Sequence, residues 1–193
     1  WENDPATRII ALYIESFGVE THVVALMPEI IPFMDTAMAP VIRKAMKNTT
    51  FHLEAKVESI DGNQVTFSKD GKQETLAADI VLMAVGRGPN LTGMGFENIG
   101  LDFDRQGIKV DEKMRTNLPN VYAVGDVTGK SLLAHSASRM GEVAVNTMFG
   151  LRDRMRYNAI PWVTYGIPEA AGCGMTETEA KEKGIAVKTA TLP

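Results

Sequence analysis

The sequence predicts an α/β protein built on a parallel sheet, and three apolar runs carry this prediction. Residues 19–27 lie between a helix that ends at Gly18 and a second helix over residues 35–46. Residues 79–85 form another apolar run, and residues 120–124 form a third, which a helical segment follows. Continuous apolar strands that alternate with helices are typical of a parallel sheet with both faces covered.

Capping and turn residues delimit the elements of the first half. Asp4 and Pro5 suit the N-cap and first turn of a helix over residues 4–17. Residues 50–60 and 65–67 have the composition of strands, and Asp-Gly-Asn at 61–63 separates them. We therefore expect these two strands to pair as an antiparallel hairpin.

After residue 151 the composition changes and a separate α+β unit begins. Three arginines and an aspartate form a charged link over residues 152–156. Beyond it, residues 160–165 and 170–174 are predicted strands, and residues 176–183 are a predicted short helix that Gly184 ends.

Composition and charge narrow the classes of function. The 193 residues carry 24 acidic and 20 basic side chains, for a net charge of −4, without a block of like charges. We therefore expect no nucleic-acid partner and no membrane partner. No apolar run is long enough to cross a bilayer, and no signal peptide is recognisable. A single cysteine allows no internal disulfide. A cytoplasmic protein is expected, or one of the mitochondrial matrix in a eukaryote.

The segment over residues 116–142 contains the strongest candidate for a ligand site. Its predicted strand ends in Gly125-Asp126, and a helix-like segment starts near Ser131. Glycine lets backbone approach a ligand closely, and an aspartate accepts hydrogen bonds from sugar-like hydroxyls. The helix start adds N–H groups and a partial positive charge. This combination predicts a site of cofactor size, although Gly-Asp after a strand is also a common turn.

Four segments in order carry a resemblance to a known family. They read THVVALMPEIIPFMD, VLMAVGRGPN, TNLPNVYAVGD with the later LLAH, and IPWVTYGIPEAAGCGMTETEAKEKGI. Together they resemble the flavoprotein disulfide oxidoreductases, and among these the dihydrolipoamide dehydrogenases most closely. The resemblance implies a Rossmann-like, NAD-binding domain over residues 1–115 and a returning segment of an FAD-binding domain over residues 116–150. It also implies the start of an α+β interface domain over residues 159–193.

The resemblance also implies roles for individual residues toward FAD. At the strand end, Gly125 and Asp126 would contact the ribityl chain of the flavin. The Asp126 carboxylate would accept a hydrogen bond from a ribityl hydroxyl. The backbone N–H groups of Leu133, Ala134 and His135 would face the pyrimidine side of the flavin. Because that contact is made by backbone, the His135 ring can equally be a partly exposed side chain with no functional role.

Toward NAD the resemblance implies two residues. Gly86 ends the predicted strand over residues 79–85, and Val57 matches a position that contacts the adenine end. An ordinary turn glycine and an ordinary strand residue are the alternatives for these two positions.

Two departures from the family concern the NAD site. The glycine-rich turn that cradles the pyrophosphate should fall at residues 2–7, which contain no glycine and carry two acids. The acid that binds the ribose hydroxyls is replaced by Ala25, and Glu29 is nearby but at the wrong spacing. Either the first residues do not continue the family's alignment or the NAD site is degraded. Ala25 lies inside well-matched sequence and favours the second explanation.

The family activity is the transfer of electrons from a dithiol such as dihydrolipoamide, through a protein disulfide and FAD, to NAD. The resemblance places the redox cysteine pair before Trp1 and the histidine–glutamate pair beyond Pro193, so we identify no catalytic residue in this chain. A homodimer and a 2-oxoacid dehydrogenase complex are the implied partners.

Two alternatives stay open. A glutathione- or mercuric-reductase-like relative is one, which Ala134-His135 disfavours because glutathione-reductase-like chains tend to have Thr-Pro there. A non-catalytic remnant that serves as a binding or assembly module is the other. No metal site is predicted, since His22 and His52 lack a second ligand at metal spacing along the sequence. Cys173 is expected to be a buried, inert thiol.

Overall fold

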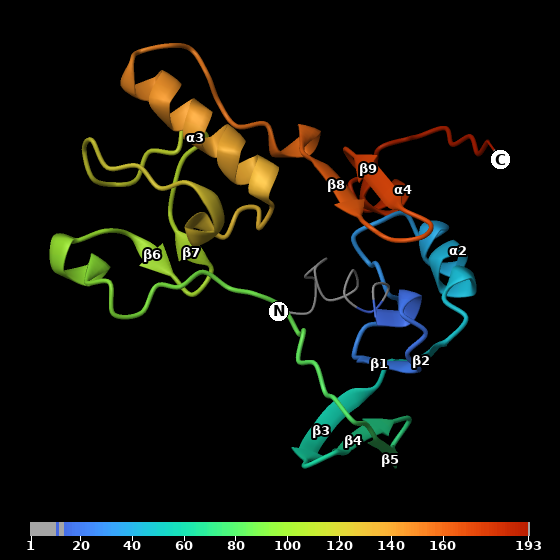
Figure 1. The fold of residues 1–193 in the computed structure, drawn as a ribbon. Helices are drawn as coiled ribbons and strands as arrows, with labels where there is room; N and C mark the ends of the chain where they lie inside the picture. Colours follow the sequence, from blue (N-terminus) through green and yellow to red (C-terminus); the bar gives the residue numbers. More distant parts are fainter. Residues whose placement is uncertain (1–10, 12–13, 193) are drawn as a thin grey trace. The chain divides into compact units, whose positions relative to one another are not determined.

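The computed structural model describes residues 11 and 14–192, which form two compact units (Figure 1). The first unit combines Trp1–Gly86 with Pro161–Pro193, and the second is the continuous segment Arg87–Ile160. This division follows packing within the chain. The assignment of residues 1–115, 116–150 and 159–193 to cofactor and interface domains stays a prediction.

A two-stranded parallel sheet lies in the first unit. Strand β1 (Thr21–Ala25) pairs with β2 (Thr49–Leu53), and α2 (Met38–Ala45) lies in the connection between them. A parallel pair needs such a crossover, because a tight turn can only join antiparallel strands. The strand predicted over residues 19–27 is therefore confirmed within narrower limits, together with its parallel pairing.

Helix α2 is shorter than the helix predicted over residues 35–46, because Asp35 does not cap it. The helix starts after Ala37, which makes no side-chain capping bond. The Asp35 carboxylate instead accepts a hydrogen bond of 2.8 Å from the Glu177 backbone N–H. This bond ties the first part of the unit to its C-terminal part.

The core of the first unit joins residues from both parts of the chain. Ala170 is buried in it, and the half-buried Trp162 packs against it, with the ring edge of Trp162 meeting Phe33 at a centroid distance of 5.8 Å. The other fully buried members are Ile30, Ile31, Met34, Ala39, Ile42 and Met46.

A three-stranded antiparallel sheet completes the first part of this unit. It consists of β3 (Lys56–Asp61), β4 (Gln64–Lys69) and β5 (Lys72–Ala77). Gly62 has φ +57° in the predicted turn, which confirms the hairpin. The run predicted as one strand over residues 50–60 is two strands, since Glu54 at φ +55° interrupts it.

Residues 79–85 are not a strand, which corrects the prediction from their apolar composition. Their side chains are largely exposed: Ile80 is 88% and Met83 is 72% accessible. A strand exists only through hydrogen bonds to a neighbouring strand, and in the described part of the chain none pairs with this run. Apolar composition therefore could not establish a strand here.

The second unit is built around α3 (Ala134–Met148), which confirms the predicted helix (Figure 1). Four short elements precede it: η1 (Phe96–Ile99), β6 (Phe103–Asp104), β7 (Gly107–Ile108) and the 3₁₀ turn η2 (Gly125–Thr128). The strand predicted over residues 120–124 forms only one bridge, Arg115 to Tyr122. The buried core beside α3 comprises Met114, Met140, Val143, Ala144 and Met155.

The last segment confirms the predicted order of strand, strand and helix. After η3 (Tyr157–Ala159) come β8 (Pro161–Thr164), β9 (Ala170–Cys173) and α4 (Glu177–Glu182). The strands β8 and β9 are antiparallel.

Two local features of this segment concern single residues. Thr176 and Glu179 form a reciprocal capping box at the start of α4. Cys173 is exposed at the end of β9, so the prediction of a buried thiol is wrong.

Among the described residues, no helix is long and apolar enough to cross a membrane.

Candidate cofactor site

The site is built on a sharp turn at Gly125. Val124 is extended, with φ −135° and ψ 152°, and Gly125 then reverses to φ +79° as η2 begins. A side chain is strained at such a φ, so glycine suits the position. The turn directs the chain from the extended segment toward α3.

One hydrogen bond holds this turn against α3, and a second closes the turn itself. The buried Gly125 N–H donates to the Met140 sulfur at 3.1 Å, and the Thr128 hydroxyl donates to the Gly125 carbonyl at 2.8 Å. Met140 is fully buried, and Thr128 is 4% accessible. The backbone at the candidate site is therefore fixed by groups that water does not reach.

The far end of η2 is packed against the hairpin of β6 and β7. A Cβ at Gly129 would overlap the carbonyl of Gln106, and a Cβ at Gly107 would overlap the carbonyl of Thr128. Both glycines have positive φ. Sequence reasoning did not single out these two glycines, since their contact joins segments more than twenty residues apart in sequence.

Asp126 presents a half-exposed carboxylate just after the turn. Its Oδ2 lies 4.0 Å from a guanidinium nitrogen of Arg87, and the Arg87 side chain also donates to the Leu132 carbonyl at 3.1 Å. Arg87 thus bridges Asp126 and the backbone that leads into α3. Sequence reasoning missed this role, although Arg87 lies inside the VGRGPN segment.

The start of α3 offers backbone donors. Leu133 is the N-cap with extended backbone, and neither its side chain nor another caps the helix. The first N–H groups of a helix lack intrahelical acceptors and carry a partial positive charge. Ala134 and His135 are the first two helical residues, and both are exposed. In the same turn Ser136 is fully buried, and its hydroxyl has no hydrogen-bond partner among the described residues.

These groups fit a flavin chemically. The Asp126 carboxylate would suit a ribityl hydroxyl as an acceptor, and the start of α3 would suit the carbonyl oxygens of a pyrimidine ring as a source of donors. The partnerless Ser136 hydroxyl adds a polar atom that a ligand or water would satisfy. Arg87 bridges the Asp126 carboxylate and the backbone at Leu132, which leads into α3.

Residues predicted for the NAD site lie around a mostly apolar cavity of about 320 Å³ in the first unit. Ala25 and Val57 both line it, together with Val85, the neighbour of Gly86. Gly86 has φ +120°, which glycine tolerates best. The structure thus brings Ala25 and Val57 to one cavity and places Gly86 beside its wall.

Among the described residues that line this cavity, none offers a carboxylate to ribose hydroxyls. Ala25 stands at the end of β1, where a dinucleotide-binding sheet carries an acid. Glu29 does not replace it, because its carboxylate pairs with Arg43 at 3.0 Å and accepts the Ile30 N–H at 2.8 Å. The predicted glycine-rich turn at residues 2–7 lies outside the described residues. The described residues do not fit the ribose of NAD.

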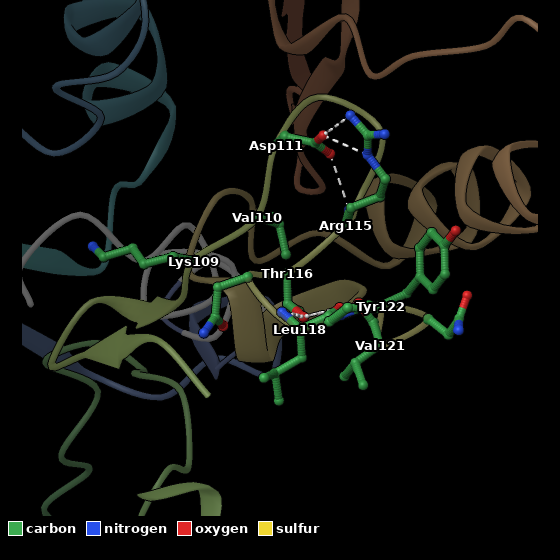
Figure 2. A pocket seen from close by; sticks show the side chains of 11 residues that line it. Lys109, Val110, Asp111, Arg115, Thr116, Leu118, Val121 and Tyr122 are labelled. Carbon is green, nitrogen blue, oxygen red and sulfur yellow. Dashed lines mark hydrogen bonds and ion pairs between the residues drawn. The ribbon is translucent and has the colours of Figure 1, made fainter. Parts of the chain in front are cut away.

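Another cavity, of about 550 Å³, lies along residues 109–122 of the second unit (Figure 2). Some of its polar side chains make hydrogen bonds within the loop. Arg115 donates to both oxygens of Asp111, at 3.0 Å from its backbone and at 2.7 Å from Nε, and the Thr116 hydroxyl donates to the Val121 carbonyl at 2.9 Å. Partial burial opposes ionisation of Asp111, but the bonds from Arg115 and Lys113 hold its pKa below the ordinary value. These bonds shape the loop, and we assign the cavity no ligand.

Comparison with known proteins identifies the family of this chain. A sequence model described as pyridine nucleotide-disulphide oxidoreductase matches residues 9–141, and a model of that family's dimerisation domain matches residues 160–193. Among curated relatives, a dihydrolipoyl dehydrogenase of Bacillus subtilis is 36% identical over 186 residues, which are 92% of this chain and 40% of that protein. One of Vibrio cholerae is 36% identical over 191 residues, 95% of this chain and 40% of that protein.

Solved structures share the fold. The HOCl-induced flavoprotein disulfide reductase RclA of Escherichia coli has a TM-score of 0.85 at 27% identity, over 99% of this chain and 45% of that one. LpdA of Mycobacterium tuberculosis has a TM-score of 0.82 at 24% identity, over 94% of this chain and 41% of that one. The chain spans about 40% of the length of the curated relatives it matches. With a family match over residues 9–141, the chain belongs to the pyridine nucleotide-disulphide oxidoreductase family.

Proposed function

We propose that this chain is part of an FAD-dependent disulfide oxidoreductase that oxidises dihydrolipoamide and passes the electrons to NAD. The observation that carries the proposal is the glycine turn at Gly125, which is fixed to α3 and followed by the half-exposed carboxylate of Asp126. The similarity to dihydrolipoyl dehydrogenases supports the choice of substrate.

In this proposal the chain binds and orients the flavin. When bound, FAD supplies the two-electron relay between a dithiol and a nicotinamide. Asp126 accepts a hydrogen bond from a ribityl hydroxyl and fixes the cofactor's position. The N–H groups of Leu133, Ala134 and His135 are directed at the pyrimidine edge, where the helix start stabilises negative charge on the reduced ring. Gly125 lets the backbone come close enough for these contacts.

In the proposed NAD site, the described residues supply no free acceptor to the ribose. Gly86 and Val57 are the residues proposed for the nucleotide, but Ala25 supplies no acceptor to the ribose and Glu29 is held by Arg43. We therefore expect NAD to bind less tightly than it binds to a relative with an acid at that position. A homodimer formed through residues 160–193 and a 2-oxoacid dehydrogenase complex are the proposed assemblies, and the cytoplasm or the mitochondrial matrix is the proposed compartment.

Replacing Asp126 by Ala tests the flavin site. Loss of one hydrogen bond to a ribityl hydroxyl should weaken FAD binding by about 1–3 kcal/mol, which is roughly a 5- to 150-fold rise in Kd. Flavin absorbance after purification and FAD titration of the stripped protein measure the effect. Asp102→Ala, which changes an exposed aspartate of the same unit, should leave the FAD affinity unchanged. Equal FAD affinities of the Asp126 and Asp102 variants would refute the assignment.

A second candidate function is a non-catalytic binding or assembly module. The specific observation in its favour is the nucleotide cavity without a ribose carboxylate. Titration with NADH separates the two functions: saturable binding at micromolar concentration excludes the module, whereas FAD retention without NADH binding supports it. Within the enzyme class, a glutathione- or mercuric-reductase-like relative stays an alternative, to be decided by assay with each disulfide substrate.

A further inference from the structure

The cavity of about 320 Å³ in the first unit has a single charged side chain, that of Lys56, among the described residues that line it. Its walls are otherwise apolar and include Leu26, Val57 and Val85. A cavity of this size suits a small organic molecule, and the few polar groups of such a site fix how the molecule lies in it. The charge of Lys56 therefore favours a molecule with an apolar body and an anionic group.

Backbone hydrogen bonds place Lys56 beside the end of β1. The Ala55 N–H donates to the Ala25 carbonyl at 3.0 Å, and Lys56 follows directly as the first residue of β3. The preceding Glu54 has an exposed side chain that is not among the residues lining the cavity. Lys56 thus lines the cavity next to Ala25, the position at which a dinucleotide-binding sheet carries the acid for the ribose hydroxyls.

The other carboxylates close in sequence do not take the place of that acid. Glu58 Oε2 lies 3.0 Å from Lys56 Nζ, and Glu58 Oε1 accepts the Ser68 hydroxyl at 2.7 Å. The bond from Ser68 and then that from Lys56 hold the pKa of Glu58 below its ordinary value. Glu29 pairs with Arg43 at 3.0 Å. Neither Glu29 nor Glu58 is among the described residues that line the cavity.

The ammonium of Lys56 keeps donors for a ligand. It has three N–H donors, and the bond to Glu58 uses one of them. Because 64% of the Lys56 side chain is exposed, an anion that enters the cavity can reach the ammonium. A phosphate carries nearly two negative charges and three acceptor oxygens, so it is a stronger partner for an ammonium than a carboxylate is.

We propose that this cavity binds the adenosine half of a pyridine nucleotide with a phosphate on the adenosine ribose, so that NADP(H) binds in preference to NAD(H). The adenine ring lies among the apolar walls, and Lys56 pairs with the ribose phosphate. Ala25 favours the same nucleotide, because an acid at that position binds a free ribose hydroxyl and repels a phosphate. The inference rests on the proposed function, since it takes the first unit to bind a pyridine nucleotide, and it specifies which one.

The test compares 2′,5′-ADP with 5′-AMP, which differ by one phosphate on the ribose and require no pyrophosphate site. Both are titrated calorimetrically into the purified chain at neutral pH and low salt. The Kd of 2′,5′-ADP should be about fivefold lower than that of 5′-AMP, which is the upper end of what an exposed charge pair contributes. Added salt should reduce this ratio, because it screens the interaction between Lys56 and the phosphate.

Substitutions locate the preference at two positions. Lys56→Gln should make the two affinities equal, whereas Lys56→Arg, which keeps the charge, should retain the preference. Lys72→Gln should also retain it and is the matched control, because Lys72 is an exposed lysine of the same antiparallel sheet that does not line the cavity. Ala25→Glu should reverse the preference toward 5′-AMP. An unaltered ratio of affinities in Lys56→Gln would overturn the proposal.

A measurement on the unaltered chain does not depend on how the variants fold. In its nuclear magnetic resonance spectrum, 2′,5′-ADP should shift the signals of the Lys56 side chain and the Val57 methyl groups, and 5′-AMP should shift those of Val57 alone. Equal affinities of the unaltered chain for both nucleotides would overturn the preference but leave nucleotide binding by the first unit in place. Failure to bind either nucleotide would overturn both, while FAD binding by the second unit is tested separately.

Discussion

Met140 offers the sharpest test of how the candidate site is held. Its sulfur accepts the buried Gly125 N–H at 3.1 Å, and its side chain is fully buried beside α3. Met140→Leu keeps the volume nearly constant but removes the acceptor, so the Gly125 N–H loses its partner. A buried donor without a partner costs about 1–3 kcal/mol, and because sulfur is a weak acceptor we expect about 1 kcal/mol.

Native-state hydrogen exchange of the α3 amides reports this loss for the second unit alone. A loss of about 1 kcal/mol should speed their exchange about fivefold when exchange follows the opening equilibrium. Met155→Leu is the control, because Met155 is buried in the same core and its sulfur accepts no hydrogen bond from the described residues. Equal exchange rates in the two variants would show that the bond to sulfur does not hold the turn.

Two further predictions concern the same unit. Gly129→Ala should lower the thermal midpoint more than Gly150→Ala, since both have positive φ but only Gly129 meets backbone of the neighbouring hairpin; equal shifts would contradict this packing. Hydrogen bonds from Asn146 and then Arg139 lower the pKa of Asp153, so its contribution to stability is present above the unfolded pKa of about 3.9. That contribution is lost as pH falls through the folded pKa. In the Asp153→Asn variant, the free energy of unfolding should therefore depend less on pH in the acidic range. An unchanged pH profile in this variant would refute the role of Asp153.

Elements with local signals could be predicted from the sequence. The turn at Asp61-Gly62-Asn63, the helix reaching Met148 and the short helix after Thr176 are all present. Each depends on residues within a few positions of each other, such as a glycine at positive φ or a capping box. Neighbouring residues alone determine such features, so no knowledge of the rest of the fold was needed.

Strands could be predicted less well, because a strand is a relation between two segments. The apolar runs over residues 79–85 and 120–124 have the composition of buried strands, yet the first is exposed and the second forms one bridge. Glu54 shows a second difficulty. A non-glycine residue at positive φ splits β2 from β3, and nothing in its residue type indicates that conformation.

In the candidate site, too, adjacent residues could be predicted from the sequence and contacts between distant segments could not. Gly125 and Asp126 could be selected from the sequence because they are adjacent and lie in a family segment, and their flavin contacts stay a prediction. Arg87 and Met140 reach the turn from distant segments. The hydrogen bond between the rings of His22 and His52 depends on the register of a parallel sheet. Spacing along the sequence cannot reveal contacts of this kind.

The discontinuity of the first unit has a consequence for synthesis on the ribosome. Trp1–Gly86 is made before Pro161–Pro193, and the core around Ile31 and Met34 is complete only when Trp162 and Ala170 have been made. The continuous segment Arg87–Ile160 can therefore fold before the unit that precedes it in sequence is finished. Until residues 161–192 emerge, the nascent chain carries an incomplete apolar core.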